Sequence, residues 1–117
     1  MRLTLTALVC AALALPATAE TTLNLALGPI DNVETLSYDC EGADPLRVQF
    51  VNAGDNALAL TEIDGAMRVF VNVVSGSGAR YVSGADTLST KGSTALLENQ
   101  LNETNVQCEQ TGEMPQE

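Results

Sequence analysis

The sequence predicts an all-β protein, a small antiparallel β-barrel or sandwich of about eight strands. Three observations lead to this prediction. Apolar and polar residues alternate with a period of two along several short segments. Clusters rich in Gly, Asp and Asn, which favour turns, separate those segments. The part of the chain that follows an N-terminal export signal is long enough for one small domain and too short for two.

The clearest strand signal is LRVQFVN, residues 46–52. Its apolar face holds Leu46, Val48 and Phe50, and its polar face holds Arg47 and Gln49. Residues 56–63, NALALTEI, repeat the pattern, with Leu58 and Leu60 expected on the buried face. Residues 67–74, MRVFVNVV, are mostly apolar on both faces and are predicted to cross the middle of a sheet. Further short strands are expected at LSYDC (36–40), ARYVS (79–83), DTLST (86–90), TALLE (94–98) and NVQCE (105–109).

The N-terminal segment is typical of a secretory signal peptide, residues 1–19. It combines Arg2, an apolar stretch and the small residues ATA before Glu20. No later run approaches the roughly 20 apolar residues of a membrane-spanning helix. A lipid anchor at Cys10 is not expected, because the bulky Val9 precedes it. We therefore expect an exported, soluble periplasmic protein with an arm or extra strand at residues 20–35, a domain at 36–109 and a frayed tail at 110–117.

Two cysteines remain after the signal peptide, Cys40 and Cys108. In an exported protein such a pair indicates a disulfide, the alternative being two free thiols. The chain has no histidine, so a zinc or haem site has almost no ligands, and no cofactor is expected.

Charge limits the partners. With Arg2 removed, four basic residues face 15 acidic ones, and the net charge is −11. Nucleic acids and anionic membranes would repel this protein, whereas a basic partner would be attracted. The acidity could also serve only to keep the protein in solution.

The stretch SGSGARY, Ser75 to Tyr81, follows the apolar run and is the most distinctive loop. Gly76 and Gly78 indicate either a flexible hairpin turn or a loop shaped for close contact. A serine nucleophile there is not supported, because there is no histidine base, the glycines stand at the wrong offsets for a nucleophile elbow, and Lys91 lies in an exposed turn. We therefore do not expect an enzyme.

Four segments in this order, SYDCEG, VNVVSGSGARYVSG, TLSTKGSTALLE and VQCEQ, resemble the C-type lysozyme inhibitor family (MliC/PliC) of bacterial envelope and periplasmic proteins. The resemblance covers Leu36 to Glu109. It implies an eight-stranded antiparallel barrel with a disulfide between its ends. Its two signatures are the Ser-Gly-Ser-Gly loop ending in Tyr81 and the Lys-Gly turn ten residues later.

The resemblance also implies a binding site. The loop would enter the active-site cleft of a C-type lysozyme, a basic enzyme. Ser77 would offer its hydroxyl to the catalytic carboxylates, and Lys91 would place its ammonium beside one of them. Gly76 and Gly78 would keep the loop thin, and Ser75 would belong to the same lysozyme-binding loop. Tyr81 would either brace the loop base or pack in the core.

One position departs from the family pattern. An aromatic residue commonly stands two positions before the signature lysine, and this chain has Ser89 there. The alternative function is therefore a periplasmic scaffold or binding module that keeps the barrel without inhibiting lysozyme. The sequence leaves the oligomeric state open.

Overall fold

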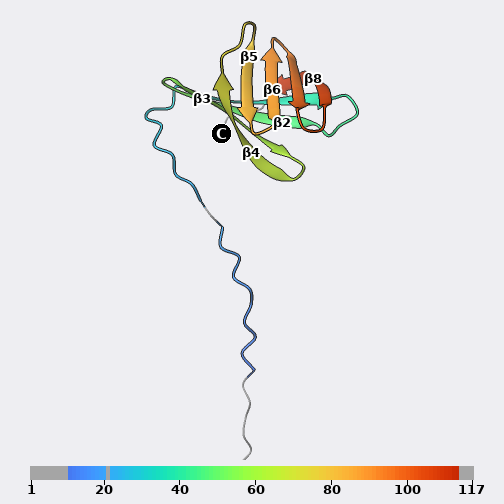
Figure 1. The fold of residues 1–117 in the computed structure, drawn as a ribbon. Coiled ribbons are helices and arrows are strands. Elements are labelled where there is room, and N and C mark those ends of the chain that lie inside the picture. Colours follow the sequence, from blue (N-terminus) through green and yellow to red (C-terminus); the bar gives the residue numbers. More distant parts are fainter. Residues whose placement is uncertain (1–10, 21, 114–117) are drawn as a thin grey trace, which may run out of the picture.

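The computed structural model describes residues 11–20 and 22–113. Within them lie eight strands: β1 (Asn32–Cys40), β2 (Leu46–Ala53), β3 (Asn56–Ile63), β4 (Ala66–Val73), β5 (Ala79–Ser83), β6 (Asp86–Lys91), β7 (Thr94–Asn99) and β8 (Thr104–Glu113). Each strand pairs antiparallel with the next, and β8 pairs with β1 to close a barrel (Figure 1). The predicted all-β antiparallel barrel is confirmed, and the sandwich alternative is excluded.

The strands extend past both ends of the expected domain, residues 36–109. β1 begins at Asn32 because residues 32–35 pair with residues 49–52 of β2, and β8 continues to Glu113 beside β1. Residues 11–20 and 22–31 form neither helix nor strand, and Figure 1 shows this arm running away from the barrel. Cys10, most of the apolar stretch of the signal peptide and residues 114–117 of the tail lie outside the described residues.

The barrel interior is filled by aliphatic and aromatic side chains from all eight strands. β2 shows the expected alternation, with Leu46, Val48 and Phe50 buried and Arg47 and Gln49 exposed. The whole buried cluster comprises Tyr38, Leu46, Val48, Phe50, Ala59, Phe70, Tyr81, Leu88, Ala95 and Cys108. Burial of these side chains is the main source of stability, and each of the larger ones contributes about 1.5–3 kcal/mol.

Two strand faces differ from the prediction. In β3 the buried side chains are Ala59 and Thr61, so Leu58 and Leu60 lie on the opposite, outer face and the expectation for them is wrong. Interior space explains the choice, because Ala59 lies opposite both Phe50 and Phe70, whose rings occupy the volume a leucine would need. The Thr61 hydroxyl is satisfied inside by donating to the Arg47 carbonyl at 2.8 Å.

The apolar strand β4 does not cross the middle of a covered sheet. Only Phe70 is buried in it, while Met67, Val69, Val71 and Val73 are exposed on the outer face. In a barrel of this size one face of every strand meets solvent, so a run that is apolar on both faces leaves half of its side chains uncovered.

The seam between β1 and β8 carries the disulfide. Cys40 lies opposite Cys108 in the strand register, and the two sulfur atoms are bonded, which confirms the expected pairing and excludes free thiols. The bridge closes a loop with a sequence separation of 68 residues, which the chain-entropy estimate values at about 4 kcal/mol.

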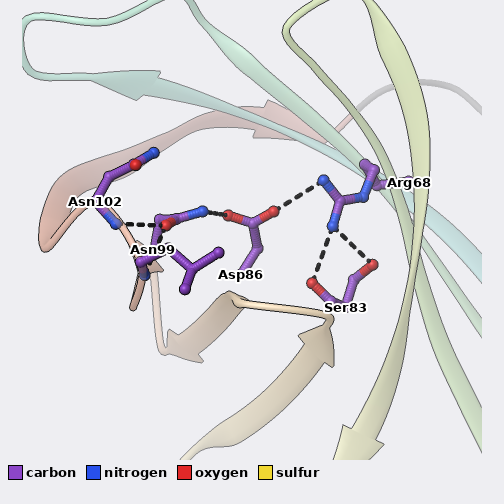
Figure 2. Close-up of polar contacts among 6 residues, drawn as sticks. Arg68, Ser83, Asp86, Asn99 and Asn102 are labelled. Atoms are coloured by element: carbon purple, nitrogen blue, oxygen red, sulfur yellow. Dashed lines mark hydrogen bonds and ion pairs between the residues drawn. The ribbon is translucent and has the colours of Figure 1, made fainter.

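At one end of the barrel a polar network replaces strand pairing. β4 pairs with β5 only at Val71–Val73. Beyond this point Arg68 bridges the two sides: its guanidinium lies 2.9 Å from the Asp86 carboxylate and donates to the Ser83 carbonyl at 3.0 Å (Figure 2). The side-chain amide of Asn99 donates a hydrogen bond to the Asp86 carboxylate at 2.6 Å. Its oxygen accepts hydrogen bonds from the backbone N–H groups of Leu101 and Asn102. The network therefore ties β4, the β5–β6 turn and the β7–β8 turn together.

No helix within residues 11–20 and 22–113 has the length and apolar character to cross a membrane.

Candidate functional site

The connections at one end of the barrel bring the two sequence signatures together. Because successive strands run in opposite directions, the β2–β3, β4–β5 and β6–β7 connections lie at the same end, which we call the loop end. The Ser-Gly loop is the β4–β5 connection, residues 74–78, and the Lys-Gly turn follows β6. Figure 1 shows the two rising together above β5 and β6.

The Ser-Gly loop projects from the loop end of the barrel and is exposed to solvent. Residues 74–78 are all exposed. The Ser75 hydroxyl donates to the Ser77 carbonyl at 2.9 Å, a bond that orders the loop from within. The predicted strand through Val74 is one residue too long, since β4 ends at Val73 and Val74 is 96% exposed.

Gly78 is the residue that joins the loop to the lysine turn. Its φ of +67° is in the left-handed region, and a Cβ there would overlap the Thr90 carbonyl oxygen and lie 3.2 Å from the Cβ of Lys91. The backbone of the loop therefore packs directly on the backbone of β6, which only glycine allows. Gly76 differs, because its φ is ordinary for any residue and nothing lies within 4 Å of its would-be Cβ.

Lys91 ends β6 at the start of a tight turn. Gly92 takes a φ of +58°, and the Thr94 hydroxyl donates to the Lys91 carbonyl at 2.8 Å. The Ser93 carbonyl accepts the Gln110 N–H at 2.8 Å, which anchors the turn on β8. The Lys91 side chain is exposed, and within the part of the chain that the structure describes its ammonium makes no ion pair. The turn thus presents a cation on a fixed backbone.

Tyr81 lies beneath the loop rather than on its surface. It is 8% exposed, and its ring centroid is 5.5 Å from that of Phe50. Burial raises the pKa of the Tyr81 hydroxyl, so the ring stays neutral at physiological pH. Tyr81 pairs with Asn72 and Leu88 at the base of the loop. This position suits both roles considered for it, core packing and support of the loop.

The position where the family commonly has an aromatic residue lies on the same side of β6 as Lys91, because Ser89 is two residues before it. Ser89 is half-buried and pairs with Arg80 and Leu96. Arg80 is exposed, and its backbone carbonyl accepts a hydrogen bond from the Asn72 amide at 3.2 Å.

Among the described side chains, no three His, Cys, Asp or Glu lie close enough together to hold a metal ion.

Comparison with known proteins identifies the family. Residues 38–105, which contain both the Ser-Gly loop and Lys91, match the family described as "Membrane-bound lysozyme-inhibitor of c-type lysozyme" (MliC). This chain belongs to the MliC family. The resemblance noted in the sequence is thereby confirmed, and the family's curated relatives are named as inhibitors of an enzyme.

Two relatives of the MliC family are similar over the barrel. A membrane-bound lysozyme inhibitor of C-type lysozyme from Pseudomonas aeruginosa is 40% identical over 67 residues, covering 56% of this chain and 53% of the relative. One from Cupriavidus necator is 39% identical over 66 residues, with the same coverage. The chain thus matches only about half the length of these curated relatives.

A solved structure of the same family also matches. It is the crystal structure of Pseudomonas aeruginosa MliC in complex with hen egg white lysozyme, with a TM-score of 0.68 and 32% sequence identity, covering 80% of this chain and 99% of that chain. The barrel of this chain is therefore an MliC barrel. That family member was crystallised with a C-type lysozyme.

Proposed function

We propose that this chain is a protein inhibitor of C-type lysozyme that works in the bacterial periplasm. The loop of Ser75–Tyr81, whose last three residues begin β5, would enter the active-site cleft of the enzyme, with Lys91 beside it. The observation that carries the proposal is the contact of Gly78 with Thr90 and Lys91, because it makes the loop and the lysine one rigid, exposed projection.

The chemistry of this projection suits a cleft lined by carboxylates. A retaining glycosidase needs one carboxylic acid kept protonated and one carboxylate kept free. The Ser77 hydroxyl can donate to a carboxylate, and the Lys91 ammonium can form a charge-assisted hydrogen bond with one. Lys91 has no acidic partner among the described residues, so binding to the enzyme would not break an ion pair within this chain.

The surroundings of the loop favour insertion. Gly76 has open space around it, so the loop is narrow at its tip. The 96% exposed Val74 at its base adds an apolar side chain that could pack on the rim of the cleft. Tyr81 and the Ser93–Gln110 hydrogen bond hold the bases of the loop and the turn, which limits the entropy lost on binding.

The test compares Ser77→Ala and Lys91→Ala with the unchanged chain, residues 20–117 in oxidised form. We expect each variant to lose tens-fold or more in inhibition of cell-wall lysis by hen egg-white lysozyme, with a matching loss of affinity in calorimetry. Both sites are exposed, so the melting temperature should not change.

Arg47→Ala is the matched control. It removes the same charge from an exposed position near the start of β2, at the end of the barrel away from the loop. It should inhibit as the unchanged chain does. If the Ser77 and Lys91 variants also inhibit fully, the assigned roles are wrong. If the folded, unchanged chain does not bind lysozyme at low or moderate salt, the scaffold alternative takes the place of the inhibitor.

A further inference from the structure

The stem of the Ser-Gly loop is the shortest strand pairing in the barrel. β4 and β5 pair only where Val71–Val73 lie opposite Arg80–Val82. In the part of the chain that the structure describes, all other neighbouring strands pair over five positions or more. Figure 1 shows the β3–β4 hairpin diverging from β5 beyond these pairs. Because two paired strands are only marginally stable by themselves, the orientation of the loop depends on what else fixes its stem.

Side-chain hydrogen bonds cross the stem at both of its ends. At the end away from the loop, Arg68 donates to the Ser83 carbonyl at 3.0 Å. At the end next to the loop, the side-chain amide of Asn72 donates to the Arg80 carbonyl at 3.2 Å. Arg80 forms the last strand pair before the loop, with Val73. The Asn72 hydrogen bond therefore closes the stem at the point where the loop begins.

Asn72 is an unusual residue for its place in β4. Residues 69–74 are otherwise entirely apolar. Asn72 follows the buried Phe70 by two positions and pairs with Tyr81, so its side chain leaves the strand on the interior face, at the mouth of the barrel. It is exposed there, so packing of the core does not require it. A valine would favour the strand more strongly but could not donate a hydrogen bond to the next strand.

The two legs of the loop are held by different contacts. The leg that enters β5 is fixed by Gly78, whose backbone packs on Thr90 of β6. The leg that leaves β4 has no such contact with β6, but Asn72 ties the end of β4 to Arg80 at the start of β5. With both contacts present, Ser77 between the legs has a fixed place. Without the Asn72 hydrogen bond, only one leg is held.

We propose that Asn72 is a positioning residue of the Ser-Gly loop. Its amide holds the two legs together and so keeps Ser77 in register with Lys91 on the projection. The effect of Asn72 on inhibition rests on the proposed function, whereas its effect on the order of the loop does not. The experiment therefore measures the two effects separately.

The first measurement is made on the free chain, residues 20–117 in oxidised form. Asn72→Ala removes the amide, and Asn72→Asp keeps its shape but removes the N–H donor. In both variants we expect the NMR order parameters of the Gly76, Ser77 and Gly78 amides to fall from about 0.85 toward about 0.6, the value of flexible backbone. Because Asn72 is exposed, the melting temperature should change little.

The second measurement is inhibition of cell-wall lysis by hen egg-white lysozyme. Both variants should inhibit about three- to tenfold less well than the unchanged chain, the size expected for the loss of one hydrogen bond. Asn105→Ala is the matched control, because it removes the same amide from an exposed position near the start of β8, at the other end of the barrel. It should match the unchanged chain in both measurements.

The outcomes separate the positioning role from the proposed function. Loop order parameters that stay unchanged in both Asn72 variants overturn the proposal, and so does an equal fall in Asn105→Ala. A loosened loop with undiminished inhibition also overturns it, because the position of the loop would then not matter for binding. If the loop loosens but even the unchanged chain does not bind lysozyme, the proposed function fails while Asn72 still orders the loop.

Discussion

At the scale of single residues, the two glycines of the loop have different tasks. Gly78 has a φ of +67° and no room for a Cβ against Thr90, whereas Gly76 has an ordinary φ and open surroundings. Gly78→Ala should therefore cost about 2 kcal/mol or more of stability, from backbone strain and displacement of the β6 backbone. Gly76→Ala should leave the melting temperature unchanged and weaken lysozyme inhibition, because it thickens only the tip.

Thermal melts and lysis assays on the two variants separate these effects. Each substitution adds one methyl group within the same loop, so each is the control for the other. A Gly78→Ala variant as stable as the unchanged chain would show that the loop does not pack on β6. A Gly76→Ala variant of full inhibitory strength would mean that the tip does not fill a narrow cleft.

At the scale of elements, the ion pair of Arg68 and Asp86 bridges the gap between β4 and β5, and its two side chains differ in burial. The side chain of Arg68 is 36% exposed and that of Asp86 only 10%. Removing Arg68 leaves a buried carboxylate without its cation, whereas removing the charge of Asp86 leaves an arginine that water can reach. We therefore expect Arg68→Met to cost about 2–3 kcal/mol and Asp86→Asn about 1 kcal/mol or less.

Urea unfolding curves of the two variants and of the double variant measure this difference. The side-chain carbonyl introduced by Asp86→Asn can still accept the hydrogen bond from Asn99. The Arg68→Met/Asp86→Asn chain should therefore recover part of the stability that Arg68→Met alone loses, because its buried site no longer holds an unpaired charge. Equal costs for the two single variants, or no recovery in the double variant, would contradict this account of the gap.

The strands also show which structural features the sequence pattern could predict and which it could not. Alternation placed β2 correctly because the large apolar side chains of Leu46, Val48 and Phe50 occupy three successive inward positions. It failed in β3 because the inward residues are small or polar, Ala59 and Thr61, and their choice depends on Phe50 and Phe70 of neighbouring strands. The exposed valines of β4 and the contact of Gly78 with Thr90 likewise depend on which strands become neighbours, which no local pattern contains.

For the candidate site, the sequence predicted the residues of the two signatures but not their surroundings. The order of the segments and their resemblance to the inhibitor family located the loop, Lys91 and the cysteines. The Arg68–Asp86–Asn99 network went unnoticed, because its residues come from three strands and carry no shared motif. A hint was present in Arg68, a charged residue at an inward position of a strand whose other residues are apolar except for Asn72.

At the scale of the whole molecule, the net acidic charge and the candidate site are different features. We therefore expect the charge to affect association with the enzyme and the site to affect dissociation. Residues 20–117 carry a net charge of −11, whereas the projection proposed to bind the enzyme carries the cation Lys91 and no acidic residue. Long-range attraction to a basic enzyme acts on the encounter and is screened within about 10 Å at 0.1 M salt. In the proposed complex, the contacts of Ser77 and Lys91 would form only after docking and would act on dissociation.

Stopped-flow or surface-based kinetics with hen egg-white lysozyme should therefore show an association rate constant that falls about tenfold between 50 and 300 mM salt, and a dissociation rate constant that changes less than about twofold. Lys91→Ala should raise the dissociation rate constant and leave the salt dependence of association almost unchanged, because it changes the net charge by a single unit out of eleven. Salt dependence confined to dissociation would mean that acidic side chains touch the enzyme directly.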